Sequence, residues 1–579
     1  MALPEAQFNN SPSTASRLTA AALARLPLYA VILLLLLLIG PPLVSLAISS
    51  FQTGAMTPRA EWSFANYLTV AEDVMRGGPV LNSVIFALGS SFVALALGGF
   101  LAFIVERTNT PMRGLGYFIA IAVIAIPTAV YAIAWTLLLG RGGLINIGLA
   151  ELFDALGWSF RPIRIASLGG MIFVEGLSFM PIAFLLLSGP IRSMDRSLEE
   201  AALVSGASAF QVLRRVSAPL LLPSIIAVLL LTVTRALEAY AVPSIIGMPG
   251  RVLVMTTEVY FSTQQLPPQY GLASSYGMVL VLLVVALLYL YTSVTAQSRR
   301  FATVTGKGFE TSIIQFGWPR YLFLAILFVY LLIMVLLPLL ILSWASVMRF
   351  YAGPTFTNLG FGQYKALLNY PIVIKAFTNS ILVSAIAATA IMAISVVVSW
   401  YTVRGAPQLR RALDLLITFP LVFPGIVLGL ALMQTYAQLP IGIYGTQAIL
   451  VIAYVTRFIP WGYRYSHTGM LQIHPELEEA ALLSRASRFQ VGTMIIAPLI
   501  IIHLIAGWTY VFLISARELE TSVLLVSSRS PVIAPLLLDI YSSGSIPQVS
   551  AFSTLIFLTF GSLAIFVYAV ARRYGIQMR

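Results

Sequence analysis

Long apolar runs separated by short polar segments dominate this sequence. The hydrocarbon core of a bilayer is about 30 Å thick, so a helix needs roughly 20 mostly apolar residues to cross it. Applied along the chain, this length predicts twelve membrane-spanning helices. Six are expected in the first half, at 27–49, 79–105, 116–140, 166–190, 217–245 and 275–297. Six more are expected in the second half, at 319–346, 376–403, 412–436, 446–470, 496–521 and 551–571.

The first apolar run, "LYAVILLLLLLIGPPLVSLAI", follows a comparatively polar stretch that carries Arg17 and Arg25. That stretch lacks a secretory pattern, so we expect a retained first helix and not a cleaved signal.

Composition agrees with a membrane protein. The chain has 579 residues, of which 59% are hydrophobic and 9% are charged. A soluble domain carries roughly a quarter charged residues, so this chain has too little charge to cover a water-facing surface. The sequence therefore predicts an all-α membrane protein. There is no cysteine, which excludes disulfides and thiolate metal sites.

The basic residues predict the orientation of the chain. Lys and Arg concentrate in cytoplasmic loops, and here they follow the even-numbered spans. This places both termini in the cytoplasm of a multi-pass inner-membrane protein and explains the net charge of +13 without nucleic acid. The residues concerned are Arg107, Arg113, Arg192, Arg196, Arg214, Arg215, Arg299, Arg300, Lys307, Arg404, Arg410, Arg411, Arg572, Arg573 and Arg579. Arg141, Arg161 and Arg164 depart from the rule, because they fall in an outer loop.

The two halves of the chain resemble each other. "LEEAALVSGASAFQVLRRVSAPL" from Leu198 and "LEEAALLSRASRFQVGTMIIAPL" from Leu477 share 15 of 23 positions. Five further pairs of features recur in the same order: Asn82-Ser83 and Asn379-Ser380, Pro127 and Pro420, Pro181 and Pro460, Arg235 and Arg517, Glu238 and Glu520. Such self-similarity indicates two parallel repeats of about six spans each.

This repeat defines the expected domains. Six spans lie between the two polar segments, so both segments emerge on the same face, which the charges identify as cytoplasmic. The expected boundaries are 1–77 for the N-terminus, first span and outer loop, 78–297 for the first core, and 298–318 for a cytoplasmic linker. They continue with 319–374 for a span and outer loop, 375–571 for the second core, and 572–579 for a basic tail.

The polar segments are too short and too polar to span a membrane. Read as a helix, Leu198 to Arg215 has acidic residues in its first turn, where the helix dipole favours them, and small residues in its middle. Such a helix fits a groove on a partner. A loop helix packed beneath its own bundle remains the simpler alternative for one copy. Two near-identical copies favour a partner that is present twice.

The pattern Glu-Ala-Ala, three residues, Gly, nine residues, then aliphatic-x-aliphatic-Pro resembles the EAA loop of permease subunits of ATP-binding-cassette (ABC) importers. The first copy has Glu199, Glu200, Ala201, Ala202, Gly206 and Pro219. The second copy has Glu478, Glu479, Ala480, Ala481 and Pro498, but Arg485 replaces the glycine. We expect that replacement to restrict the swivelling of this loop or to weaken its docking.

The resemblance covers nearly the whole chain and is strongest to the fused, twelve-span iron(III) permeases. It implies two tandem six-helix repeats of the type I permease (MetI-like) fold. It implies two copies of an ABC ATPase below the membrane, a substrate-binding protein outside, and alternating access driven by partner-bound ATP. The first span of each half is expected to wrap the opposite half. Iron(III) is the expected cargo; a phosphonate, sugar phosphate, thiamine or polyamine is the alternative.

Charged groups inside spans are costly and often functional. Six such residues are therefore candidates for the translocation path or its gate: Glu175, Arg235, Glu238, Arg457, Arg517 and Glu520. Arg235 and Glu238 are three residues apart, so they share a helix face, and Arg517 and Glu520 repeat that spacing. A structural ion pair is the alternative for each pair. Carboxylates suit a ferric ion and arginines suit an anionic cargo, so the sequence leaves the cargo open.

Other classes of function fit less well. His467, His474 and His503 lack the spacing of a helical metal pair, and "VTGKGFET" around Lys307 lacks the glycine of a phosphate loop. We therefore expect no metal site, no cofactor, no ATPase of the chain's own and no enzyme. A secondary transporter would also have twelve spans in parallel halves, but "ERTNTPMRG" after the second span does not fit its usual loop.

Overall fold

The computed structural model describes residues 14–194, 196–298, 313–351, 357–487 and 490–573. The predicted linker around Lys307, with Arg299 and Arg300, lies outside these residues, as does Arg579. The chain divides into a smaller unit of residues 1–41, 384–421 and 454–512 and a larger unit that holds the rest. The domain boundaries expected from the repeat remain predictions.

The described chain is built from helices and one two-stranded hairpin, β1 (Gln52–Thr53) paired with β2 (Glu61–Trp62). The first repeat contains α1 (Thr14–Ser50), α2 (Ala65–Met75), α3 (Pro79–Arg107), α4 (Gly114–Ala125), α5 (Thr128–Leu139), α6 (Leu144–Ala155), α7 (Leu168–Arg192), α8 (Arg196–Val204), α9 (Ala209–Val212), η1 (Leu213–Ser217), α10 (Ala218–Glu238), η2 (Pro243–Gly247), η3 (Met248–Gly250), α11 (Met255–Gln264) and α12 (Tyr270–Ser298).

The second repeat has a similar order of elements, but its described residues contain no counterpart of β1, β2 or α6. It contains α13 (Pro319–Leu331), η4 (Leu332–Leu336), α14 (Leu337–Ser346), α15 (Gly362–Leu368), α16 (Pro371–Arg404), α17 (Pro407–Thr418), η5 (Phe419–Val422), α18 (Gly425–Gln438), α19 (Gln447–Leu471), α20 (Pro475–Leu483), η6 (Val491–Ile496), α22 (Ala497–Ala516), η7 (Ser522–Leu524), α23 (Ile533–Ser542) and α24 (Ile546–Arg573).

Ten helices within the described residues are long and apolar enough to cross a membrane, and a helix pair bent by 99° raises the number to eleven if the pair is counted as one span. The all-α membrane fold is thereby confirmed. The seventh span, predicted at 319–346, begins and ends at those residues. The tenth, α19, has 25 residues but carries Arg457, Arg464 and His467, and it is not among the ten.

The third span differs from its prediction. A single helix over 116–140 is wrong, because the chain breaks at Ile126 and Pro127 into α4 and α5. The 99° bend in the second repeat lies at the equivalent place, where Pro424 precedes α18. Each proline lacks an amide hydrogen and restricts the residue before it, so the preceding helix ends there. Pro424, and not Pro420, is therefore the counterpart of Pro127.

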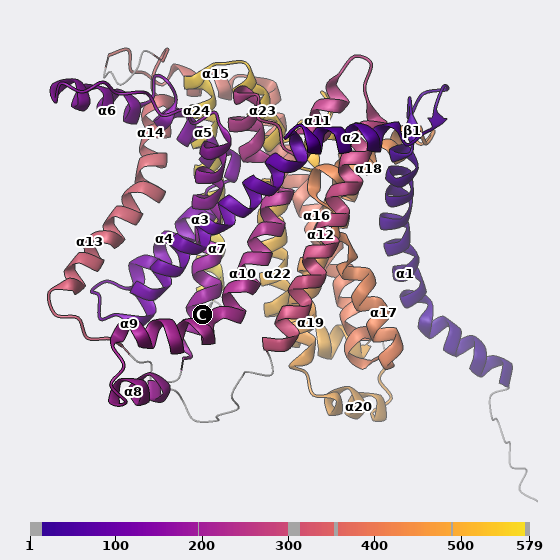
Figure 1. Cartoon of the computed structure of the whole chain (residues 1–579). Coiled ribbons are helices and arrows are strands. Elements are labelled where there is room, and N and C mark those ends of the chain that lie inside the picture. Colours follow the sequence, from indigo (N-terminus) through magenta and orange to yellow (C-terminus); the bar gives the residue numbers. More distant parts are fainter. Residues whose placement is uncertain (1–13, 195, 299–312, 352–356, 488–489, 574–579) are drawn as a thin grey trace, which may run out of the picture. The chain divides into compact units, whose positions relative to one another are not determined.

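The larger unit has a core of helices from the first repeat. α3 packs along α7 and α10, and α10 also packs against α12 (Figure 1). Gly98 makes the α3–α7 contact possible: a Cβ atom there would lie 2.7 Å from the carbonyl oxygen of Met180. Small residues let helix backbones approach closely, which is the main source of helix association inside a bilayer.

The same hydrogen bond locks the segment after the first span of each repeat. The hydroxyl of Tyr67 in α2 donates to Ser50 Oγ at 2.8 Å, and the hydroxyl of Tyr364 in α15 donates to Ser346 Oγ at 2.7 Å. Both tyrosines lie in the short helix that follows a span. The repeat seen in the sequence is therefore a repeat of contacts as well.

In the smaller unit, a buried apolar cluster lies beneath the second polar segment. Met470 and Ile473 at the end of α19 pack with Val491, Ile496 and Ile500 of the next span. Trp400 of α16 and Ala481 of α20 pack against this cluster. α20 therefore rests on a packed base formed by three helices.

Candidate functional site: two clamped helix-turn segments

The first polar segment contains a turn in its middle. α8 ends at Val204, and Gly206 follows with a left-handed φ of +88°. The amide of Gly206 donates to the carbonyl of Leu203, and that of Ala207 donates to Ala202, both at 3.0 Å. This pair of bonds is the usual closure of a helix that ends on a left-handed residue. The continuous helix predicted over 198–215 is therefore wrong.

A second helical stretch starts directly after this turn. The amide of Ser208 donates to Gln211 Oε1 at 2.8 Å, and the amide of Gln211 donates to Ser208 Oγ at 3.3 Å. This reciprocal arrangement is a capping box, which satisfies amides at the start of a helix. Ser487 and Gln490 make the same two bonds in the second segment, at 2.8 and 3.2 Å.

Arg485 adopts the turn that Gly206 makes. Its φ is +65°, and its amide donates to Leu482 at 3.0 Å while the amide of Ala486 donates to Ala481 at 3.1 Å. A non-glycine residue in this conformation costs roughly 1–2 kcal/mol. The backbone turn is thus kept without the glycine. The expected effect of Arg485 on swivelling and docking remains a prediction.

The first glutamate of the first segment is buried and paired. The guanidinium of Arg107, at the end of α3, donates to the carboxylate of Glu199 in α8. The hydroxyl of Ser217, just before α10, donates to the other carboxylate oxygen at 2.7 Å. Glu199 thereby ties the segment to the end of one span and the beginning of another.

The first glutamate of the second segment is held in the same way. Arg404 Nε, at the end of α16, donates to Glu478 Oε1 at 2.8 Å, and Arg404 Nη2 donates to the Ile473 carbonyl at 2.8 Å. Trp400 Nε1 donates to Glu478 Oε2 at 3.3 Å. We call these two arrangements the Arg107–Glu199 clamp and the Arg404–Glu478 clamp.

The second glutamate of each segment faces outward. Glu200 and Glu479 are exposed, as are Ala201 and Ala480, while Ala202 and Ala481 are half-buried. Pro219 and Pro498 lie exposed in the first turn of the next helix. Each segment therefore presents one carboxylate and small side chains on its surface while its first carboxylate fixes it to a span.

A second set of contacts recurs beyond the opposite ends of α3 and α16. Ser83 Oγ accepts from the amide of Met255 at 2.7 Å, at the start of α11, and Ser380 Oγ accepts from the amide of Ile533 at 2.9 Å, at the start of α23. A span therefore carries a helix-cap contact near its beginning and a clamp at its end.

Three of the charged residues predicted for the path lie close together in the larger unit. Glu175 in α7 is 1% exposed, and both Glu520 and Arg235 are near enough to act on it electrostatically. Arg235 Nη1 donates to Glu238 Oε2 at 3.1 Å, so the predicted ion pair forms. Arg517 Nη1 donates to the Ile124 carbonyl at 2.8 Å, in the last turn of α4. Arg457 belongs to the smaller unit, where its guanidinium lies 5.8 Å from the centre of the Phe458 ring.

Within the described residues, no three His, Asp or Glu side chains gather into a group that could hold a metal ion. Glu175 and Glu520 are two carboxylates near the guanidinium of Arg235. This is a group of charged side chains and not a set of metal ligands.

Known proteins that resemble this chain are transport permeases. Residues 94–340 match the family described as the binding-protein-dependent transport system inner membrane component. The chain is 24% identical over 552 residues to the ferric transport system permease protein FbpB of Actinobacillus pleuropneumoniae, covering 93% of this chain and 77% of that one. It is 24% identical over 519 residues to a putative ferric transport system permease protein, FbpB 1 of Haemophilus influenzae, covering 87% and 78%. These matches support a fused permease of the ABC-importer class, similar to the ferric transport permeases.

The permease is a fused one, since these relatives match it across both repeats. A shorter relative matches part of this chain: the putative 2-aminoethylphosphonate transport system permease protein PhnU of Salmonella typhi is 28% identical over 215 residues, covering 37% of this chain and 73% of that one.

Two functional residues of the permease were missed by sequence reasoning. Arg107 and Arg404 were assigned only an orienting role, as basic residues that follow a span. Their signal was their equivalent place in the repeat, since 107 and 404 are separated by the same 297 positions as 82 and 379.

Proposed function

We propose that this permease is the membrane conduit of an ATP-driven importer, that it works by alternating access, and that its cargo is iron(III). The observation that carries the importer assignment is the pair of clamped segments. They share backbone turns, capping boxes and buried ion pairs, although their sequences differ at 8 of 23 positions. Two surfaces with the same local structure fit two copies of the same ATPase subunit.

We infer that the two adjacent glutamates of each segment have different roles. Glu200 and Glu479 contact the ATPase, because they lie on the exposed side of each segment. Glu199 and Glu478 transmit the resulting movement to α3 and α16 through the two clamps. Each clamp is a charge-assisted contact that is largely sealed from water, so it is stronger than a surface ion pair.

The iron assignment rests on the two relatives whose names specify ferric transport and which match most of this chain. Ferric iron prefers hard oxygen ligands, and Glu175 and Glu520 supply carboxylates near each other. Iron is a substrate here, passed along and not stored. An anionic cargo is the second candidate, because Arg235 and Arg517 lie in the same region and one relative is named for a phosphonate.

The coupling proposal is tested by Glu200→Lys combined with Glu479→Lys. We expect the ATPase subunit to be lost from the purified complex and ATP-driven uptake to fall to background, since reversing a charge at an interface costs several kcal/mol. Uptake is measured in vesicles loaded with ATP and supplied with the loaded binding protein.

The matched control reverses two exposed acids outside the segments, Glu72→Lys and Glu151→Lys. Co-purification of the ATPase should persist in this control. Normal uptake by the Glu200/Glu479 variant would overturn the coupling proposal.

Cargo is tested separately in the same vesicles. Radiolabelled ferric iron and 2-aminoethylphosphonate are each offered with the binding protein that acts with this permease. We expect iron uptake, with a strong decrease in Glu175→Gln. Uptake of the phosphonate alone would replace the iron assignment and leave the importer assignment intact.

A further inference from the structure

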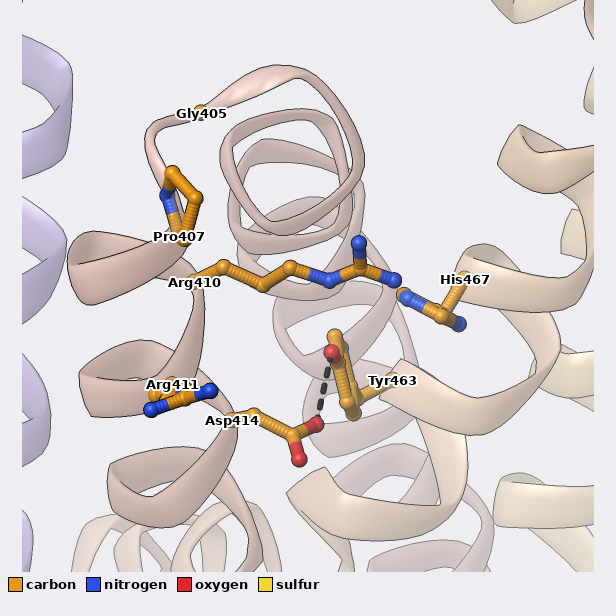
Figure 2. A pocket seen from close by; sticks show the side chains of 7 residues that line it. All are labelled: Gly405, Pro407, Arg410, Arg411, Asp414, Tyr463 and His467. Atoms are coloured by element: carbon orange, nitrogen blue, oxygen red, sulfur yellow. Dashed lines mark hydrogen bonds between the residues drawn. The ribbon is translucent and has the colours of Figure 1, made fainter.

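One cavity of the smaller unit lies beside the Arg404–Glu478 clamp. It has a volume of about 410 Å³ and is lined by Gly405, Pro407, Arg410, Arg411, Asp414, Tyr463 and His467. Gly405 directly follows Arg404, so the cavity begins one residue from the clamp. Figure 2 shows Arg410 reaching across it towards His467 on the facing helix, α19.

Positively charged side chains outnumber negatively charged ones in the lining of this cavity. Asp414 is close in sequence to both arginines, but its Oδ1 accepts a hydrogen bond from the Tyr463 hydroxyl at 3.0 Å (Figure 2). Among the described side chains, no carboxylate forms an ion pair with Arg410 or Arg411. Two guanidiniums and one carboxylate leave the cavity with net positive charge. The cavity also lies at the N-terminal turn of α17, where the helix dipole favours anions.

In the first repeat, an aromatic side chain occupies the equivalent place, and the nearby positive charge is paired with a carboxylate. Tyr117 stands where Asp414 stands, and its ring packs on Phe184 with 5.1 Å between ring centres. Its hydroxyl donates to Glu106, and Arg192 Nε donates to the same carboxylate at 2.9 Å. The second repeat has Val403 and Leu471 in place of Glu106 and Arg192, so this ion pair is missing there.

We propose that the cavity beside the Arg404–Glu478 clamp binds a phosphate group through Arg410 and Arg411. Guanidinium forks match phosphate oxygens in geometry as well as charge. His467 and the Tyr463 hydroxyl add polar groups on the opposite wall. The phosphate belongs either to the head group of an anionic lipid or to a soluble phosphate-type anion. Basic pockets between helices at the cytoplasmic side of a membrane are typical sites for such head groups.

A phosphate bound at this site restrains the arginine of the Arg404–Glu478 clamp. A phosphate held by the N-terminal turn of α17 fixes the short connection Gly405–Ala406, which joins the clamp arginine to α17. The proposal is independent of the cargo and of the ATPase contact, because it rests only on the cavity and its charges.

The test uses the full chain in nanodiscs. One set contains phosphatidylcholine only, and another contains phosphatidylcholine with one fifth phosphatidylglycerol. After extraction into mild detergent, native mass spectrometry counts the phosphatidylglycerol that stays bound. Inorganic phosphate is titrated against the protein from the first set by calorimetry. Variants are Arg410→Gln, Arg411→Gln and both together.

Arg113→Gln is the matched control, because Arg113 is the counterpart of Arg410 in the repeat whose cavity is filled. We expect retention of one phosphatidylglycerol, or saturable phosphate binding, in the native chain and in Arg113→Gln. Each loss of a guanidinium–phosphate contact should weaken binding about tenfold. Retained lipid without phosphate binding identifies a head-group site, and phosphate binding without retained lipid identifies a soluble anion.

A second variant should bind phosphate more tightly than the native chain, which is a result that misfolding cannot produce. Asp414→Asn removes the one negative charge of the lining and leaves an oxygen that accepts from Tyr463, so it should tighten binding severalfold. Absence of both lipid retention and phosphate binding in the native chain would overturn the proposal. An equal decrease in Arg113→Gln and Arg410→Gln would overturn it too.

Discussion

The two clamps make the same ion pair in different surroundings. In the Arg107–Glu199 clamp, the side chain of Arg107 is 6% exposed and that of Glu199 is 12% exposed. In the Arg404–Glu478 clamp, Arg404 is 19% exposed and Glu478 is 11% exposed. The third partner also differs: Ser217 in the first clamp, and Trp400 with the Ile473 carbonyl in the second.

The difference shows what a clamp requires. A buried ion pair recovers its desolvation cost only when further hydrogen bonds satisfy the remaining oxygens and protons. Both carboxylates have partners for their two oxygens, supplied by different residues from different elements. Among the described residues, Arg107 Nη1 has no hydrogen-bond partner, so the first clamp meets the requirement only in part. The contact between the glutamate and the arginine at the end of the span is thus the shared element, and its surroundings have diverged.

The largest expected effect comes from removing one arginine. Arg107→Gln leaves Glu199 buried without its counter-ion and should cost about 3–5 kcal/mol. Arg404→Gln should cost less, because Arg404 is more exposed to solvent. Thermal unfolding of the purified permease and ATP-driven uptake measure the two effects, with Arg113→Gln as the exposed control. Equal melting temperatures for Arg107→Gln and Arg113→Gln would contradict the clamp.

An intermediate effect is expected at the opposite ends of the same spans. Asn379 donates to the Pro531 carbonyl at 2.9 Å and accepts from Gln447 at 2.7 Å, whereas Asn82 donates to the Leu253 carbonyl at 3.0 Å. Leaving buried partners unsatisfied costs about 1–3 kcal/mol. Asn379→Leu should therefore lower the melting temperature more than Asn82→Leu. If Asn82→Leu lowered the melting temperature more than Asn379→Leu, these two side chains would not be what holds the segments before α11 and α23 in place.

The smallest effect is expected at the turn. Gly206→Ala places a Cβ atom in a left-handed conformation, and Arg485→Gly removes one, so the two changes should shift local stability by about 1 kcal/mol in opposite directions. Hydrogen exchange of the amides of Ala207 and Ala486, each of which closes a turn, measures this. A change of the same sign in both variants would indicate that side-chain contacts outweigh backbone strain.

Much of the fold was predictable because membrane spans are specified locally. A run of roughly 20 apolar residues is sufficient evidence of a span, and the seventh span was placed to the residue. The break between α4 and α5 was not predicted, since the apolar run continues through Ile126 and Pro127. The length of the run predicts one continuous helix, whereas Pro127 separates two helices. The repeat helped less than it could, because Pro127 was aligned with Pro420 and not with Pro424.

The candidate site was predictable in its location and not in its contacts. The duplicated segment identified Glu199 and Glu478 together with Glu200 and Glu479, but nothing local distinguishes the inward carboxylate from the outward one. That distinction depends on Arg107 and Arg404, which lie 92 and 74 residues earlier in the chain. The cavity at Arg410 and Arg411 was missed for a related reason: these residues fitted the orientation rule, which explained their charge without requiring a contact.

The spacing between counterparts is 297 residues from Asn82 to Pro127, 279 residues at Pro181 and the two polar segments, and 282 residues at Arg235 and Glu238. The 18 extra residues of the first repeat fall in the stretch that contains α6, between two anchored spans. This stretch differs in length between the repeats, whereas the contacts that hold the ends of α3 and α16 recur in both. It is thus a place where the duplicated gene has been free to diverge, and where an inserted epitope should leave assembly intact.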